Sequence, residues 1–70
     1  MENSSKPLHE QISYSIHLSQ YTVHSFAQQL NIKLKTLEAY MDGSEIPEKK
    51  TITRMNKYLK NKIDYPKKII

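Results

Sequence analysis

The stretch that most constrains the fold is TVHSFAQQLNIKLKTLEAYMDG, residues 22–43, in which two amphipathic segments flank one break. Asn31 forms the break, because Asn is among the non-glycine residues that most readily adopt positive φ. Gly43 then ends the second segment in the manner of a C′ glycine. The inward faces of the two segments consist of Phe26, Ala27 and Leu30, and of Leu37, Tyr40 and Met41. The stretch therefore predicts two short helices joined by a tight turn, a helix-turn-helix.

Apolar residues at helical spacing predict two more helices. We expect the four helices at about residues 8–18, 22–29, 33–42 and 49–59, with Glu48 as a weak N-cap of the last. Residues 1–7 are predicted to form a tail, residues 8–65 a single domain and residues 66–70 a second tail. Ile63 and Tyr65 either close the core or begin a short fifth helix. The fold class is therefore all-α, a compact bundle of four to five helices.

Composition excludes several classes of protein. The chain has 70 residues, one Gly and no Cys, so it has neither a disulfide framework nor a thiolate metal site. No apolar run is long enough for a signal peptide or a membrane helix, and we expect a cytoplasmic protein. His9, His17 and His24 lack metal-ligand spacing, and we predict no cofactor and no enzymatic activity. What remains is a small binding domain.

The charge is distributed unevenly along the chain. The net charge is +4. Residues 1–47 carry three lysines against five carboxylates, whereas residues 48–70 carry eight basic side chains against two carboxylates. Basic charge concentrated in one segment favours an anionic partner such as a duplex backbone. The alternative, a Lys-rich helix face that only contacts water, stays open on this observation.

An ordered set of residues resembles the core of the Xre/Cro/repressor helix-turn-helix family. The resemblance covers residues 8–63 and implies a lambda-repressor-like DNA-binding domain. The matching positions are Phe26–Ala27, Asn31, Ile32, Thr36–Leu37, Tyr40, Gly43, Ile46–Pro47 and Leu59.

The resemblance also implies roles for individual residues. The helix that begins near Lys33 lies in the major groove, where Leu34, Lys35 and Ala39 contact bases. The residues expected to contact phosphates are Thr22, Val23, Lys33, Ser44, Lys49 and Lys50. The residues expected at a homodimer interface are Ile63, Tyr65, Ile69 and Ile70.

Three departures from the family pattern carry expectations of their own. Ile16 and Met41 replace an ion pair common in the family, so we expect these two side chains to be in contact. Ser25 replaces an acidic residue, which predicts the loss of the reciprocal capping box. Asp42 stands where a phosphate-contacting residue is usual, so we expect modest affinity for each half-site and a need for dimerisation.

Two functions follow as hypotheses. The first is a sequence-specific double-stranded DNA-binding regulator, most simply a repressor of phage, prophage or bacterial genes. The second is a module of the same fold that binds a regulatory protein partner, as an antirepressor or an antitoxin-like adaptor does. Glu38 and Asp42 motivate the second hypothesis, because they leave the predicted reading helix without net charge.

Overall fold

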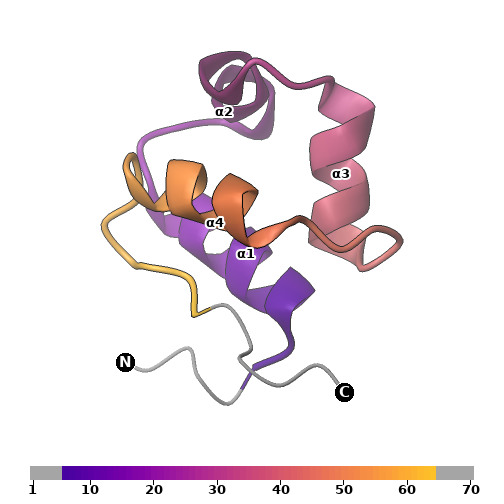
Figure 1. Ribbon diagram of the computed structural model, residues 1–70. Helices are drawn as coiled ribbons and strands as arrows, with labels where there is room; N and C mark the ends of the chain where they lie inside the picture. Colours follow the sequence, from indigo (N-terminus) through magenta and orange to yellow (C-terminus); the bar gives the residue numbers. More distant parts are fainter. Residues whose placement is uncertain (1–5, 65–70) are drawn as a thin grey trace.

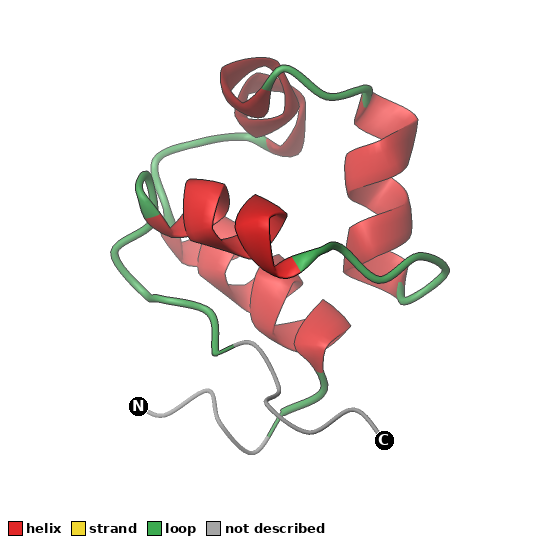
Figure 2. Cartoon of the chain, viewed as in Figure 1, coloured by secondary structure: helices red, strands yellow, loops and turns green. Residues whose placement is uncertain are grey.

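The computed structural model describes residues 6–64, and this part of the chain contains four helices and no strand. The helices are α1 (Leu8–Leu18), α2 (Val23–Leu30), α3 (Leu34–Asp42) and α4 (Lys49–Asn56). Figures 1 and 2 show α4 in front of α1, with α2 and α3 beside this pair. The all-α prediction is confirmed, with four helices in residues 6–64. Tyr65, which was considered for a fifth helix, lies outside the described residues.

One apolar core holds the four helices together. Ile12, Phe26, Leu37 and Met55 come one from each helix, and all are fully buried. The other buried apolar members of the core are Ile16, Ala27, Leu30, Ile52, Leu59 and Ile63. Each helix therefore turns one face inward, as the apolar spacing predicted. The opposite faces of α3 and α4 are exposed, and these carry the predicted base-contacting residues together with Lys49 and Lys50.

The turn between α2 and α3 has the conformation that the sequence predicts. Asn31 adopts the left-handed region at φ 61°, and the Ile32 N–H donates to the Ala27 carbonyl oxygen at 3.0 Å. Gly43 ends α3 at φ 90°, where a Cβ would lie 3.3 Å from His9 Cγ. Positive φ and this close approach both favour glycine at position 43.

The start of α2 corrects one expectation. The Ser25 N–H donates to Thr22 Oγ1 at 3.0 Å, and the Thr22 N–H donates to Ser25 Oγ at 2.9 Å. The reciprocal capping box is therefore present, and the prediction that Ser25 abolishes it was wrong. The serine side chain reaches the Thr22 N–H with its hydroxyl oxygen, so an acidic residue is not needed at position 25.

Polar side chains fasten the segments between helices. The only arginine, Arg54, donates to the Leu30 carbonyl oxygen at 2.7 Å and so ties α4 to the end of α2. The Asn56 side chain makes hydrogen bonds to both the N–H and the carbonyl of Ile63. Buried Gln11 accepts from the Asp64 N–H at 2.7 Å. These bonds place residues 57–64 against α1 and α4, and periodicity alone gave no sign of them.

Candidate nucleic-acid interface

The outward surface of α3 is mixed in charge. Leu34, Glu38 and Asp42 are exposed and four residues apart, so they form one row along the helix. Lys35 is exposed and Ala39 half-buried, and these two form the neighbouring row. The three predicted base-contacting residues thus occupy two adjacent rows of one helix. Glu38 lies on the same surface, in the row of Leu34. The exposed Glu38 carboxylate contributes a negative charge to this surface and can also accept hydrogen bonds.

The first turn of α2 offers two backbone N–H groups to an anion. The Thr22 hydroxyl and N–H are both engaged with Ser25, so Thr22 serves primarily as the cap. The N–H groups of Val23 and His24, the next two along the chain, have no recorded partner among residues 6–64. Orphan N–H groups at a helix N-terminus favour a bound phosphate. Val23 therefore keeps its predicted role better than Thr22 does.

An open hollow of about 690 Å³ lies between α1, the start of α2 and the end of α3. Its wall includes Thr22 and Val23, together with Ile16 and Met41. The start of α2 and the second half of α3 therefore border the same depression. Ile16 and Met41 lie on the same side of the molecule, as their expected contact requires.

Asp42 is part of a local turn at the end of α3. The Ser44 N–H donates to Asp42 Oδ1 at 2.8 Å. Hydrogen bonds from the Ser44 side chain and backbone, together with nearby His9, lower the pKa of the Asp42 carboxyl. The carboxylate therefore stays ionised, and the Ser44 N–H is not available to a phosphate. The Ser44 side chain is also hydrogen-bonded to Asp42, so a phosphate at Ser44 competes with that carboxylate.

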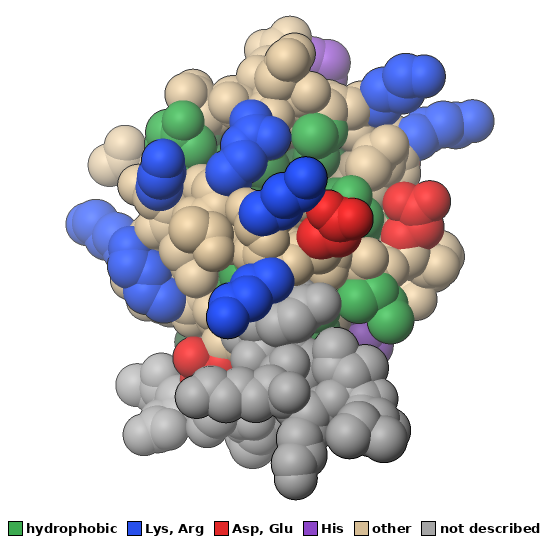
Figure 3. Space-filling view, viewed as in Figure 1, with side chains coloured by type: hydrophobic (Ala, Val, Ile, Leu, Met, Phe, Trp, Pro, Cys, Tyr) green, Lys and Arg blue, Asp and Glu red, His purple; other side chains and the backbone are tan. Residues whose placement is uncertain are grey.

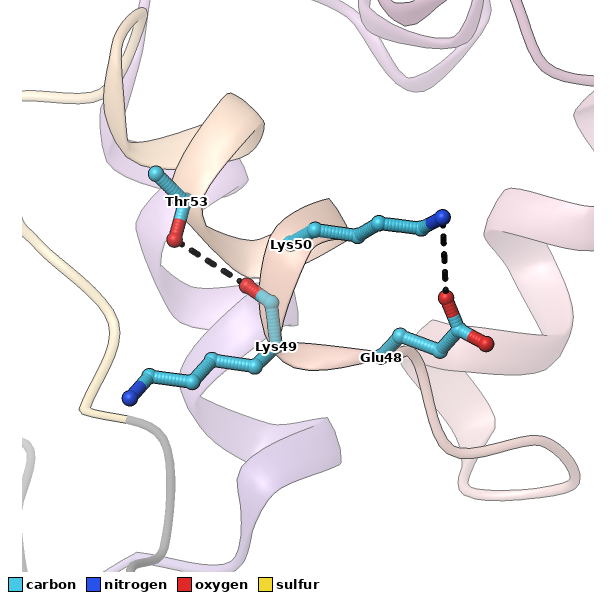
Figure 4. A network of polar contacts seen from close by, with 4 residues as sticks. All are labelled: Glu48, Lys49, Lys50 and Thr53. Carbon is cyan, nitrogen blue, oxygen red and sulfur yellow. Dashed lines mark hydrogen bonds and ion pairs between the residues drawn. The ribbon is translucent and has the colours of Figure 1, made fainter.

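The predicted phosphate contacts at the start of α4 point in different directions. Figure 4 shows the Lys50 side chain reaching toward Glu48, while the Lys49 side chain extends away from both. Lys50 Nζ lies 3.6 Å from Glu48 Oε1, and the two side chains are 83% and 73% exposed. A pair this exposed contributes little to stability, so a phosphate can displace the carboxylate. Lys33, the N-cap of α3, is also exposed.

The predicted dimer interface is only partly within the described chain. Ile63 is 3% exposed and belongs to the core, so its side chain is not available to a second copy. The sequence suggested both roles for Ile63, and its hydrogen bonds to Asn56 explain why it closes the core. Tyr65, Ile69 and Ile70 lie outside the described residues.

No protein-family model, curated protein or solved structure matches this chain. Among residues 6–64, no helix has the length and apolar character needed to cross a membrane. Any functional conclusion therefore depends on the geometry and chemistry of the exposed residues described above.

Proposed function

We propose that this chain is a sequence-specific double-stranded DNA-binding regulator of the Xre/Cro type, with α3 as the helix that enters the major groove. The observation that carries the proposal is the α2–turn–α3 unit. Asn31 forms its turn, Gly43 ends α3, and buried Leu37 anchors α3 from within. The opposite face of α3 is left exposed on a rigid support, which is what a reading helix requires.

The side chains on that face match the edges of several bases. Lys35 can donate to guanine O6 or N7, whereas Leu34 and Ala39 can contact a thymine methyl group. Glu38 adds an acceptor for the N4 amino group of cytosine. We therefore expect recognition of a mixed sequence rather than of a run of one base pair.

The backbone contacts of this complex come from both sides of α3. The N–H groups at the start of α2 hold one phosphate, and Lys33, Ser44, Lys49 and Lys50 lie on the flanking segments. Such contacts fix the register of a protein on the duplex without reading its sequence. The simplest action is repression in the cytoplasm by occupation of an operator, with two copies bound to half-sites about one helical turn apart.

The test is a selection from randomised duplex DNA at about physiological salt, followed by sequencing of the bound fraction. We expect one enriched site, and for Lys35→Ala a relaxed preference at one position worth about 1–3 kcal/mol. The control is Lys33→Ala, which should weaken binding to all sequences alike because Lys33 contacts only phosphate. If Lys35→Ala left every base preference unchanged, α3 would not be the reading helix.

The second function, a protein-binding module, is favoured by one feature. Ile46 is 69% exposed in the loop after α3 and borders an apolar hollow of about 210 Å³ with Leu8, Tyr40 and Pro47. An exposed apolar group beside such a hollow suits a protein partner. The selection separates the two functions, because a protein-binding module would enrich no DNA sequence.

A further inference from the structure

A second charged surface lies on α4 and the segment that follows it. Residues 49–63 contain six basic side chains and no carboxylate. The six are Lys49, Lys50, Arg54, Lys57, Lys60 and Lys62. Figure 3 shows Lys and Arg side chains gathered over the face on which α4 lies, with Asp and Glu side chains at its margins. This surface therefore has nearly one sign of charge.

Three of the six basic side chains have partners within the protein. Lys50 pairs with Glu48, and Arg54 donates to the Leu30 carbonyl oxygen. Lys62 Nζ donates to the carbonyl oxygens of Asn56 and Leu59, at 2.7 and 2.9 Å. The bonds of Arg54 and Lys62 close the ends of α2 and α4, whereas the exposed Lys50–Glu48 pair contributes little to stability.

The other three side chains are Lys49, Lys57 and Lys60, which we name the basic arc. All three are exposed, and the structure records no ion pair for any of them among residues 6–64. Lys49 begins α4 and Lys57 is its C-cap residue, so the two lie about 12 Å apart along the helix axis. Such a spread is wide enough to contact several phosphates of a duplex, which carries a charge about every 1.7 Å.

We infer that the basic arc binds the phosphate backbone of duplex DNA without regard to base sequence. Ammonium groups on flexible stems act as point charges and make no fixed pair of hydrogen bonds to a base edge. The arc would thus supply affinity that the surface of α3 lacks, because the basic and acidic side chains of α3 offset one another. The inference rests on the proposed function only in naming duplex DNA as the partner.

The arc fits a nucleic acid better than a lipid surface. A helix that lies on a membrane buries an apolar face between the headgroups. The apolar face of α4, Ile52 and Met55, is already buried in the core. The side chains exposed along α4 itself are basic or, at Thr53, hydroxylic. This leaves only electrostatic attraction, which a duplex satisfies with its dense row of phosphates.

The test compares two variants that remove the same charge. The first is Lys57→Gln with Lys60→Gln, which spares every residue predicted to contact DNA around α3. The second is Lys33→Gln with Lys35→Gln, which changes α3 and its N-cap. Binding of the full chain to a duplex of random sequence is measured by fluorescence anisotropy over a series of KCl concentrations, and the unfolding midpoint of each variant is checked against the wild type.

We expect the slope of log K against log salt to fall by about 1.8 for the arc variant, since each lost phosphate contact removes about 0.9. The arc variant should still select the same DNA site as the wild type, whereas the α3 variant should not. An unchanged slope would overturn the inference and leave the proposed function standing. A third outcome would overturn the proposed function alone: the wild type selects no DNA site, but the slope of log K against log salt still falls in the arc variant. The inference would also be overturned if the arc variant lost binding to RNA, an acidic protein or anionic vesicles but bound duplex DNA as the wild type does.

Discussion

The exposed surfaces of α3 and α4 differ in charge, although the faces that these two helices turn toward the core are similar. Both are short, both lack a side-chain hydrogen bond at the N-cap, and both turn a fully buried side chain inward, Leu37 and Met55. Outside, α3 alternates basic, acidic and apolar groups, whereas α4 presents basic groups without a carboxylate. The core therefore constrains only half of each helix, and the other half is free to differ.

This difference suggests a division of labour between the two helices. A mixed surface discriminates between partners, because each wrong partner leaves some group unpaired. A surface of one sign attracts any polyanion and so contributes affinity and association rate. Discrimination on α3 and attraction on α4 are compatible in one small domain only if neither surface is needed to hold the fold.

The largest effects on stability are expected from substitutions on the buried faces that α3 and α4 have in common. Leu37→Ala and Met55→Ala should each lower the free energy of unfolding by about 2–5 kcal/mol, because each removes fully buried apolar volume. Urea unfolding monitored by circular dichroism measures this loss. The control Leu37→Met conserves volume and should cost less than about 1.5 kcal/mol. If only one of the two alanine variants were destabilised, the helices would not share the core equally.

Arg54 tests whether the basic residues of α4 are equivalent. Arg54→Met should lower the free energy of unfolding by about 1.5 kcal/mol, because the Leu30 carbonyl loses a charged donor at 2.7 Å. The matched variant Lys57→Gln should stay within about 0.5 kcal/mol of the wild type, since no hydrogen bond or ion pair joins the Lys57 side chain to another of residues 6–64. Equal stability of the two variants would place Arg54 with the surface lysines and contradict its structural role.

Much of this fold could be predicted because local signals and the core agree. The break at Asn31, the end at Gly43 and the buried faces of all four helices followed from periodicity and backbone preferences. The predicted boundaries of the first three helices were right to within one residue. The fourth was predicted too long, because Leu59 continues the apolar spacing although α4 ends at Asn56.

Long-range polar contacts could not be predicted in the same way. The bond between Gln11 and Asp64 joins residues 53 apart in the sequence, and no local pattern indicates it. The bond from Arg54 to the Leu30 carbonyl oxygen joins residues 24 apart, and it depends on the end of α2 lying beside α4. The capping box could not be predicted from the family resemblance, because the Ser25 hydroxyl makes the bond that an acidic side chain makes in the family pattern.

Glu38 offers a sharper test of the mixed surface on α3. Glu38→Gln removes a carboxylate from the outward row of the helix, so binding to random duplex should strengthen by on the order of 1 kcal/mol. Preference for cytosine at one position should fall at the same time, because a neutral amide is a weaker acceptor for its amino group. Anisotropy on random and selected duplexes measures both changes. The control Asp64→Asn lies outside α3 and should alter neither.

The smallest effect concerns Asp42, the other carboxylate in the outward row of α3. Hydrogen bonds from Ser44 lower the pKa of Asp42 below its usual 3.8. A lowered pKa in the folded state means that the bonds stabilise the fold fully above pH 3.8 and that this contribution is lost as the pH falls through the folded value. The wild type should therefore lose stability on acidification slightly more than Asp42→Asn does.

Urea unfolding of both proteins, above and below that pH, measures the difference. Because Asp42 is exposed, the gap between the two curves should be small and should close at the acid end. A gap that widened on acidification would contradict the local role of the carboxylate. If the gap closes as expected, the charge of Asp42 is explained by the turn that ends α3. An acidic residue in this position would then no longer favour a protein partner over DNA, and Glu38 alone would carry that distinction.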